Sequence, residues 1–209
     1  MDVKKKPAKT IFGIKVKKET TIANLMGLLI TPLVAIAAGS YINAMMPYLL
    51  QDEAYFGIEF ANVGSKAGEV IFWAYLLSTL VTPFMGYVYD ILGRFWFIVP
   101  SCFFLSLMIA IVPLSSPHFW LLCAFRSIMS MLINVIHVNP LIIDYVKTES
   151  RGLVMSFASL GIVFGELVMV LMFSMTRGLE ISAQYTYPAF IISSMALTLI
   201  FLVREPVIK

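Results

Sequence analysis

Polar side chains recur along one apolar stretch of the chain, residues 119–146, and they are Arg126, Ser130, Asn134, His137 and Asp144. At 100° per residue these five positions lie within about 80° of one face of a helix. An arginine inside a bilayer costs at least about 2.5 kcal/mol, so it faces protein or water rather than lipid. The stripe therefore predicts a cavity in which Arg126 receives an anionic group and His137 carries protons near neutral pH. An interhelical hydrogen-bond network that holds no ligand is the alternative.

Two polar residues outside this stretch are further candidates for the cavity. Glu166 is expected to serve as the counter-ion of Arg126 or as a proton carrier. Asn43 can line the same cavity, although an ordinary packing contact is the favoured interpretation.

The pair Gly161 and Gly165 has the spacing that lets another helix approach closely. Pro140 is expected to bend the fourth apolar stretch and to move Asp144 off the stripe.

The sequence contains no pattern that supports enzyme chemistry. The two histidines, His118 and His137, have no histidine or cysteine neighbours at metal-ligand spacing. A phosphate-binding loop, a nucleophile elbow and a zinc-protease motif are all absent from the sequence. We therefore expect a protein that is not an enzyme, with no cofactor and no metal.

The composition indicates a protein whose solvent is lipid. Of the 209 residues 60% are hydrophobic and 13% are charged, and the mean hydropathy is +0.90. Soluble domains carry about 25% charged residues. Six apolar stretches are long enough, or nearly so, to cross a bilayer as helices. They are residues 22–50, 70–89, 95–114, 119–146, 153–175 and 187–203. The predicted fold class is all-α, a polytopic membrane protein with six transmembrane helices.

The distribution of lysine and arginine predicts the orientation of these helices. One side carries the basic N-terminal tail, residues 1–21, together with Arg94, Lys147, Arg151, Arg204 and Lys209. The other side carries Lys66 and Arg177. Six crossings from 22 to 203, with the short tail 204–209, then place both termini on the cytoplasmic or matrix side. The tail is expected to touch anionic lipid, and no basic domain accompanies it that would indicate a nucleic-acid partner.

Three motifs occur in the order expected for a known family. The segment Gly86-Tyr-Val-Tyr-Asp90-Ile-Leu-Gly93-Arg94 joins the second and third stretches. The segment from Asp144 to Gly152, which contains Lys147, Glu149 and Arg151, joins the fourth and fifth, and Arg126 lies early in the fourth. Together they resemble the N-terminal six-helix half of the major facilitator superfamily of transporters. Ser130 and Phe95 depart from the pattern, because a glycine and a second base often stand at those places.

The resemblance implies roles for the charged residues of the loop between the second and third helices. Asp90 would pair with a base or a helix N-terminus, and Arg94 would pair with Asp144 or Glu149. Gly86 and Gly93 would allow helices to approach closely. Such a charge pair acts as a latch that a rocking motion breaks, or it only fixes the topology; both interpretations stay open.

The resemblance also implies secondary transport of a small polar or anionic solute by alternating access. Superfamily members usually have twelve helices with the substrate between two halves, and six are expected here. The chain would then pair with a second six-helix half, a copy of itself or a sister chain. The alternative is a structural or accessory subunit of a larger membrane complex, derived from such a half. A fragment of a longer transporter is the third interpretation.

Overall fold

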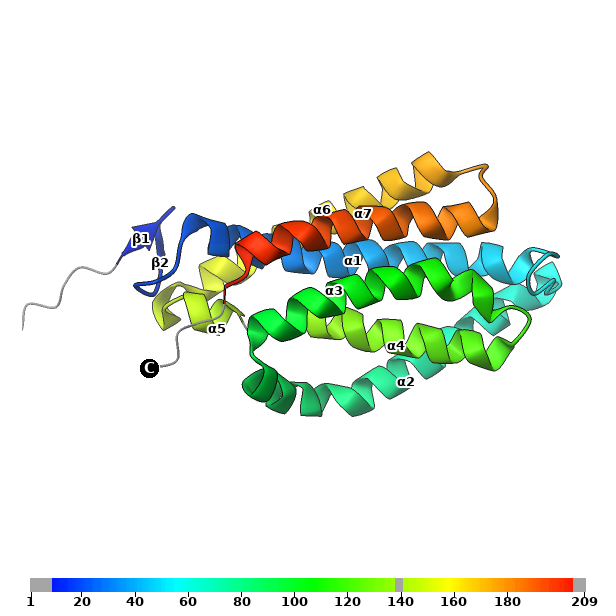
Figure 1. The fold of residues 1–209 in the computed structure, drawn as a ribbon, viewed down its shortest axis with the longest axis horizontal. Helices are drawn as coiled ribbons and strands as arrows, with labels where there is room; N and C mark the ends of the chain where they lie inside the picture. Colours follow the sequence, from blue (N-terminus) through cyan, green and yellow to red (C-terminus); the bar gives the residue numbers. More distant parts are fainter. Residues whose placement is uncertain (1–8, 138–140, 205–209) are drawn as a thin grey trace, which may run out of the picture.

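The computed structural model describes residues 9–137 and 141–204, and long helices dominate this part of the chain (Figure 1). The long helices are α1 (Ile22–Gln51), α2 (Phe60–Leu92), α3 (Arg94–Ile111), α4 (Phe119–His137), α6 (Arg151–Thr176) and α7 (Ile181–Leu202). A 3-10 turn, η1 (Val112–Ser115), extends α3, and the short helix α5 (Leu141–Tyr145) and the turn η2 (Thr148–Ser150) lead into α6. Pro140, expected to bend the fourth helix, lies outside the described residues.

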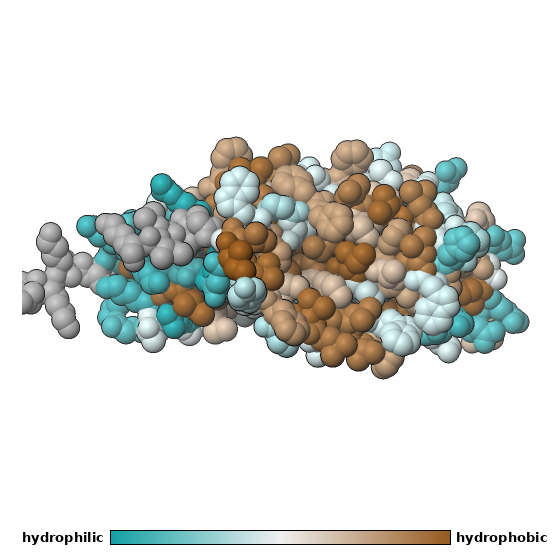
Figure 2. All heavy atoms as spheres, turned by 60° about the horizontal axis from the view of Figure 1, so that its bottom comes forward, coloured by the Kyte–Doolittle hydropathy of each residue, from teal (hydrophilic) through white to brown (hydrophobic). Residues whose placement is uncertain are grey.

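Six helical segments of the described chain are long and apolar enough to cross a membrane, and α4 and α5 together make one of them. The all-α class is thereby confirmed, and the number of helices suited to crossing a membrane agrees with the six predicted spans. On the face shown in Figure 2, apolar side chains cover the middle of the bundle, whereas hydrophilic ones gather at its two ends. Length, composition and this surface belt together support an integral, multi-pass membrane protein.

The helices extend beyond the apolar stretches from which they were predicted. α2 begins ten residues earlier than expected, at Phe60 rather than Val70, and α7 begins at Ile181 rather than Tyr187. The added turns contain polar residues, among them Lys66, Glu69 and Gln184. Hydropathy marks the part of a helix suited to hydrocarbon, but helical hydrogen bonding continues into the polar interface, where water also satisfies the ends.

Helix α1 lies at the centre of the bundle and packs along α6, while α2 packs along α4 and α3 along α7. The predicted close approach at Gly161 and Gly165 is confirmed, and the partner is α1. A Cβ added to Gly161 would overlap the carbonyl oxygen of Leu29, and one added to Gly165 would lie 2.8 Å from that of Leu33. Only glycine lets these two backbones come so close.

Part of the predicted basic tail is folded rather than extended. Strands β1 (Thr10–Ile11) and β2 (Ile14–Lys15) form an antiparallel hairpin whose turn residues, Phe12 and Gly13, both have positive φ. The hairpin is joined to the end of α5 by a bridge between Val16 and Val146.

Both ends of the described chain lie at the same end of the bundle. The hairpin and the last turn of α7 are both at the left in Figure 1. The amide of Asn24, in the first turn of α1, donates to the carbonyl oxygen of Leu202 at 3.1 Å. This arrangement is what six crossings require, because an even number of antiparallel passes returns the chain to its starting side.

Candidate functional site

A polar cavity of about 210 Å³ lies between α1, α2 and α4. Four of the five predicted stripe residues line it, as does Asn43, and these are Arg126, Ser130, Asn134, His137 and Asn43. The helical face derived from residue spacing therefore points into a real cavity. Asn43 faces the polar space, which contradicts the favoured interpretation of an ordinary packing contact.

Arg126 is the most deeply buried charged residue at this cavity, with 1% of its surface exposed. Its guanidinium donates from Nη1 to Ser130 Oγ at 2.6 Å and from Nη2 to Asn43 Oδ1 at 2.7 Å. The Nε–H is buried and has no hydrogen-bond partner. Both partners are neutral, and no carboxylate lies within ion-pair distance of Arg126 in residues 9–137 and 141–204. The positive charge is solvated by the protein but not neutralised.

Asn134 and His137 line the cavity further along α4 than Arg126. The side-chain amide of Asn134 donates to Ser78 Oγ, whose hydroxyl in turn lies 3.4 Å from the carbonyl oxygen of Ser130. This link ties α4 to α2 across the cavity wall. His137 Nδ1 is buried without a hydrogen-bond partner among the described residues. Two nitrogen atoms of cavity-lining residues, Arg126 Nε and His137 Nδ1, are thus buried without a hydrogen-bond partner among the described residues.

Glu166 is not the counter-ion of Arg126 in this structure. Its carboxylate accepts a hydrogen bond from Ser40 Oγ at 2.6 Å, and Ser40 lines the cavity next to Asn43. Glu166 itself is exposed on α6. The counter-ion interpretation is wrong because Glu166 was assigned from its chemistry alone, and helix spacing carries no information about which helices adjoin. Its alternative role as a proton carrier stays a prediction.

Asp144 is separate from the cavity and belongs to a charged cluster at the hairpin end of the bundle. Arg94 donates from Nε to Asp144 Oδ2 at 3.0 Å and from Nη1 to Asp90 Oδ1 at 2.8 Å. Arg94 Nη1 also donates to the carbonyl oxygen of Tyr89 at 2.9 Å. The cluster therefore joins the ends of α2, α3 and α5. The expected partners of Arg94 were Asp144 or Glu149, and the structure selects Asp144.

Of the two loop glycines, Gly86 does not have the role that the resemblance implied, and Gly93 has a role in the turn. A Cβ added to Gly86 would meet nothing within 4 Å, so no helix approaches closely there. Gly93 is the single residue between α2 and α3 and has a φ of 85°. A residue with a side chain is strained in that backbone region. Gly93 is needed for the reversal of the chain, whereas Gly86 is not needed for packing.

Residues of the segment from Asp144 to Gly152 attach the hairpin to the bundle. Glu149 Oε2 lies 2.5 Å from Lys15 Nζ, and both side chains are exposed. The hydroxyl of the neighbouring Ser150 accepts a hydrogen bond from the Lys15 backbone at 3.0 Å. Arg151 is the first residue of α6, and its Nε is buried without a hydrogen-bond partner in the described part of the chain. Glu149 thus pairs with Lys15 of the hairpin and not with Arg94.

Sequence reasoning missed three residues of the cavity region, and they are Ser40, Tyr75 and Ser78. Ser40 stands three residues before Asn43 and therefore shares its helical face, a signal that was available. Tyr75 lines the cavity from α2, and Ser78 follows it by three residues. Nothing in the sequence indicates that α2 adjoins α4, so these two could be found only in the folded chain.

No family model matches the chain, and comparisons with curated proteins and with solved structures find no significant match. The class of the protein therefore rests on its own fold: an all-α chain with six helices long and apolar enough to cross a membrane in its described residues, and a polar cavity between three of them.

Proposed function

We propose that the chain is half of a secondary transporter that moves a small anionic or polar solute by alternating access. The observation that supports this most is the state of Arg126: its charge is buried, faces a cavity and has only neutral partners. A buried cation without a carboxylate is costly, and a bound anion would neutralise it.

The size and lining of the cavity favour a small solute. A volume of about 210 Å³ is below the range of about 300–1,000 Å³ typical of drug-sized ligand clefts. Asn43, Ser130 and Asn134 offer neutral donors and acceptors around the arginine, which suits a carboxylate or phosphate carrying further polar groups. His137 would couple proton movement to the solute, since histidine changes charge near physiological pH.

A second six-helix half is the proposed partner, and both termini are proposed to lie on the cytoplasmic or matrix side. Alternating access needs two halves that rock about a site between them. Of the six candidate spans, α2 and α6 are the least buried, and large apolar side chains are exposed along both. A copy of this chain or a sister chain would cover these faces and complete the cavity.

Solute uptake into liposomes tests the proposal. The full chain would be reconstituted, and entry of labelled acetate, lactate, succinate and inorganic phosphate measured with and without a pH gradient. Uptake of at least one anion is expected for the wild type, with loss in Arg126→Ala. The matched control is Arg177→Ala, which removes an exposed arginine in the connection between α6 and α7, outside the cavity lining. Equal uptake by Arg126→Ala and the control would overturn the proposal.

A structural subunit of a larger membrane complex is the second candidate. The hydrogen bonds from Arg126 to Ser130 and Asn43 favour it, because they also describe an interhelical network that holds α1 against α4 without any ligand. Purification from native membranes separates the candidates. Recovery with unrelated subunits at fixed stoichiometry supports the structural role, whereas a particle of two six-helix halves in native nanodiscs supports the carrier.

A further inference from the structure

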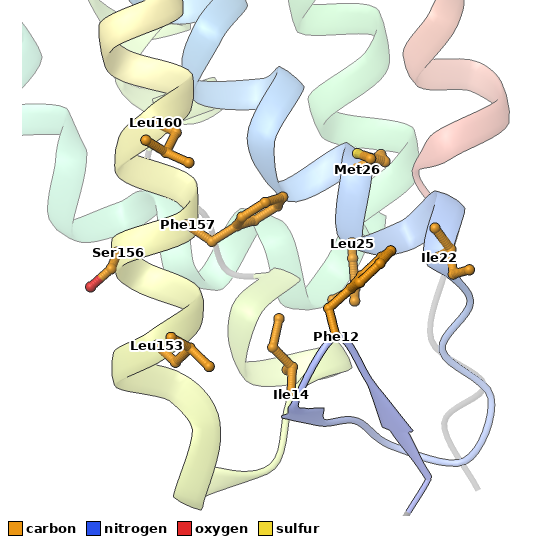
Figure 3. A pocket seen from close by; sticks show the side chains of 9 residues that line it. All are labelled: Phe12, Ile14, Ile22, Leu25, Met26, Leu153, Ser156, Phe157 and Leu160. Atoms are coloured by element: carbon orange, nitrogen blue, oxygen red, sulfur yellow. The ribbon is translucent and has the colours of Figure 1, made fainter.

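An apolar groove of about 480 Å³ lies at the hairpin end of the bundle, between the first turns of α1 and α6. The hairpin closes it from below, with Phe12 and Ile14 reaching toward the two helices (Figure 3). Met26 lines the groove from α1, and Phe157 and Leu160 line it from α6. Its volume is within the range of about 300–1,000 Å³ typical of ligand clefts.

The lining of the groove suits a hydrocarbon chain. Its base is made of buried residues, Leu25 and Ile14, and its rim of exposed ones such as Leu153. Ser156 is the single polar side chain in the lining, and its hydroxyl donates back to the carbonyl oxygen of Gly152 at 3.3 Å. No free polar group is left in the groove, so the matching ligand surface is apolar.

Positive charge stands beside this apolar lining. The loop that joins the lining residues Ile14 and Ile22 carries three exposed lysines, and they are Lys15, Lys17 and Lys18. Lys15 pairs with Glu149, but Lys17 and Lys18 form no ion pair in the described part of the chain. A hydrogen bond of 2.9 Å from the Lys17 backbone to the Tyr145 carbonyl oxygen holds the loop against the bundle. The lysines are thus kept near one end of the groove.

We propose that this groove binds one anionic glycerophospholipid of the membrane leaflet at the hairpin end. One acyl chain occupies the space between α1, α6 and Phe12, and the phosphate lies by Lys17 and Lys18. Apolar burial holds the chain, and the lysines select an anionic headgroup. The bound lipid joins the hairpin to both helices. This inference does not depend on the transport function.

Native mass spectrometry of the full chain tests the site. The protein would be reconstituted in vesicles of equal parts phosphatidylglycerol and phosphatidylcholine, extracted in mild detergent and weighed. The wild type is expected to retain one phosphatidylglycerol, preferred over phosphatidylcholine by roughly fivefold or more, as two surface lysines can provide. Leu160→Trp fills the groove and should abolish retention. Lys17→Gln with Lys18→Gln should keep one lipid but lose the preference for phosphatidylglycerol.

Matched controls come from the same helix and from the opposite end of the bundle. Leu167→Trp changes an exposed leucine of α6 outside the groove, and Lys66→Gln removes a lysine at the other end; both should behave as wild type. If Leu160→Trp fails to fold by circular dichroism, Met26→Trp takes its place on α1. Equal retention by groove and control variants overturns the proposal. So does equal retention of both lipids by the wild type, or a groove occupied by a second protein chain.

Discussion

Arg94 and Arg126 are both largely withdrawn from solvent, but their charges are handled in opposite ways. Arg94, at the hairpin end of the bundle, touches the carboxylates of Asp90 and Asp144 and a backbone carbonyl. Arg126, inside the bundle, forms hydrogen bonds to a hydroxyl and an amide oxygen and has no acidic partner among the described residues. The first arginine is neutralised and joins three helix ends. The second retains an uncompensated charge beside a cavity, which is the property expected of a binding residue rather than a structural one.

The largest expected effect concerns the cavity arginine and solute binding. Arg126→Lys keeps the positive charge but removes the forked N–H donors to Asn43 and Ser130. Arg126→Ala removes the charge as well as these donors. If Arg126 binds the solute anion, uptake falls about 100-fold or more in the alanine variant, as expected when one partner of a buried charge pair is lost. The lysine variant should retain an intermediate rate. Uptake rates in liposomes measure this, and equal rates in all three proteins would remove the proposed difference between the two arginines.

The second prediction compares the stability effect of one substitution at both arginines. Arg94→Met leaves Asp144 without its cation, so the free energy of unfolding falls by about 2 kcal/mol. Arg126→Met removes a buried charge that has no acidic partner, so stability stays the same or rises. Denaturation in mixed detergent micelles, followed by circular dichroism, measures both. A larger loss at Arg126 would mean that its neutral partners already satisfy it and that the network interpretation holds.

The third prediction separates the two acids of the Arg94 cluster. The side chain of Asp144 is 16% exposed and that of Asp90 is 72% exposed. Asp144→Asn should lower the free energy of unfolding by about 1.5 kcal/mol, and Asp90→Asn by less than about 0.5 kcal/mol, because exposed pairs are screened. Added salt should weaken the Asp90 contribution first. Equal effects would indicate that both acids share the charge of Arg94.

The smallest expected effects concern the two glycines beside Arg94. Gly93→Ala places a side chain at positive φ and should lower the free energy of unfolding by about 1 kcal/mol. Gly86→Ala, within a helix and facing open space, should raise it by about 0.5 kcal/mol. The same denaturation measurement distinguishes them. A strong loss at Gly86 would instead reveal a partner that approaches that face in the membrane, as a second half would.

Much of the cavity could be predicted from residue spacing because one helix supplies most of it. Arg126, Ser130, Asn134 and His137 recur at three- and four-residue steps, and a helix necessarily places such residues on one face. Asp144 shared that periodicity but not the location, since it belongs to α5 and pairs with Arg94. Spacing is reliable along one uninterrupted helix and fails beyond it.

The pairing of Arg94 with Asp144 was expected only as one of two options. Asp144 and Glu149 are both near the end of the fourth helix, and the sequence does not say which one faces α3. In the structure Lys15 pairs with Glu149 and Arg94 pairs with Asp144. Both pairs join segments distant in sequence, and residue spacing along one helix carries no information about them.

The sequence by itself determined the six apolar helices, their antiparallel order and the polar face of the fourth, because hydropathy and helical periodicity are local properties. Only the tertiary structure decided that Asn43 and Ser78 join Arg126 and Asn134, that Glu166 meets Ser40 instead of the arginine, and that the hairpin closes an apolar groove. These are contacts between helices distant in sequence, and side-chain packing selects them from many arrangements that the same local patterns permit.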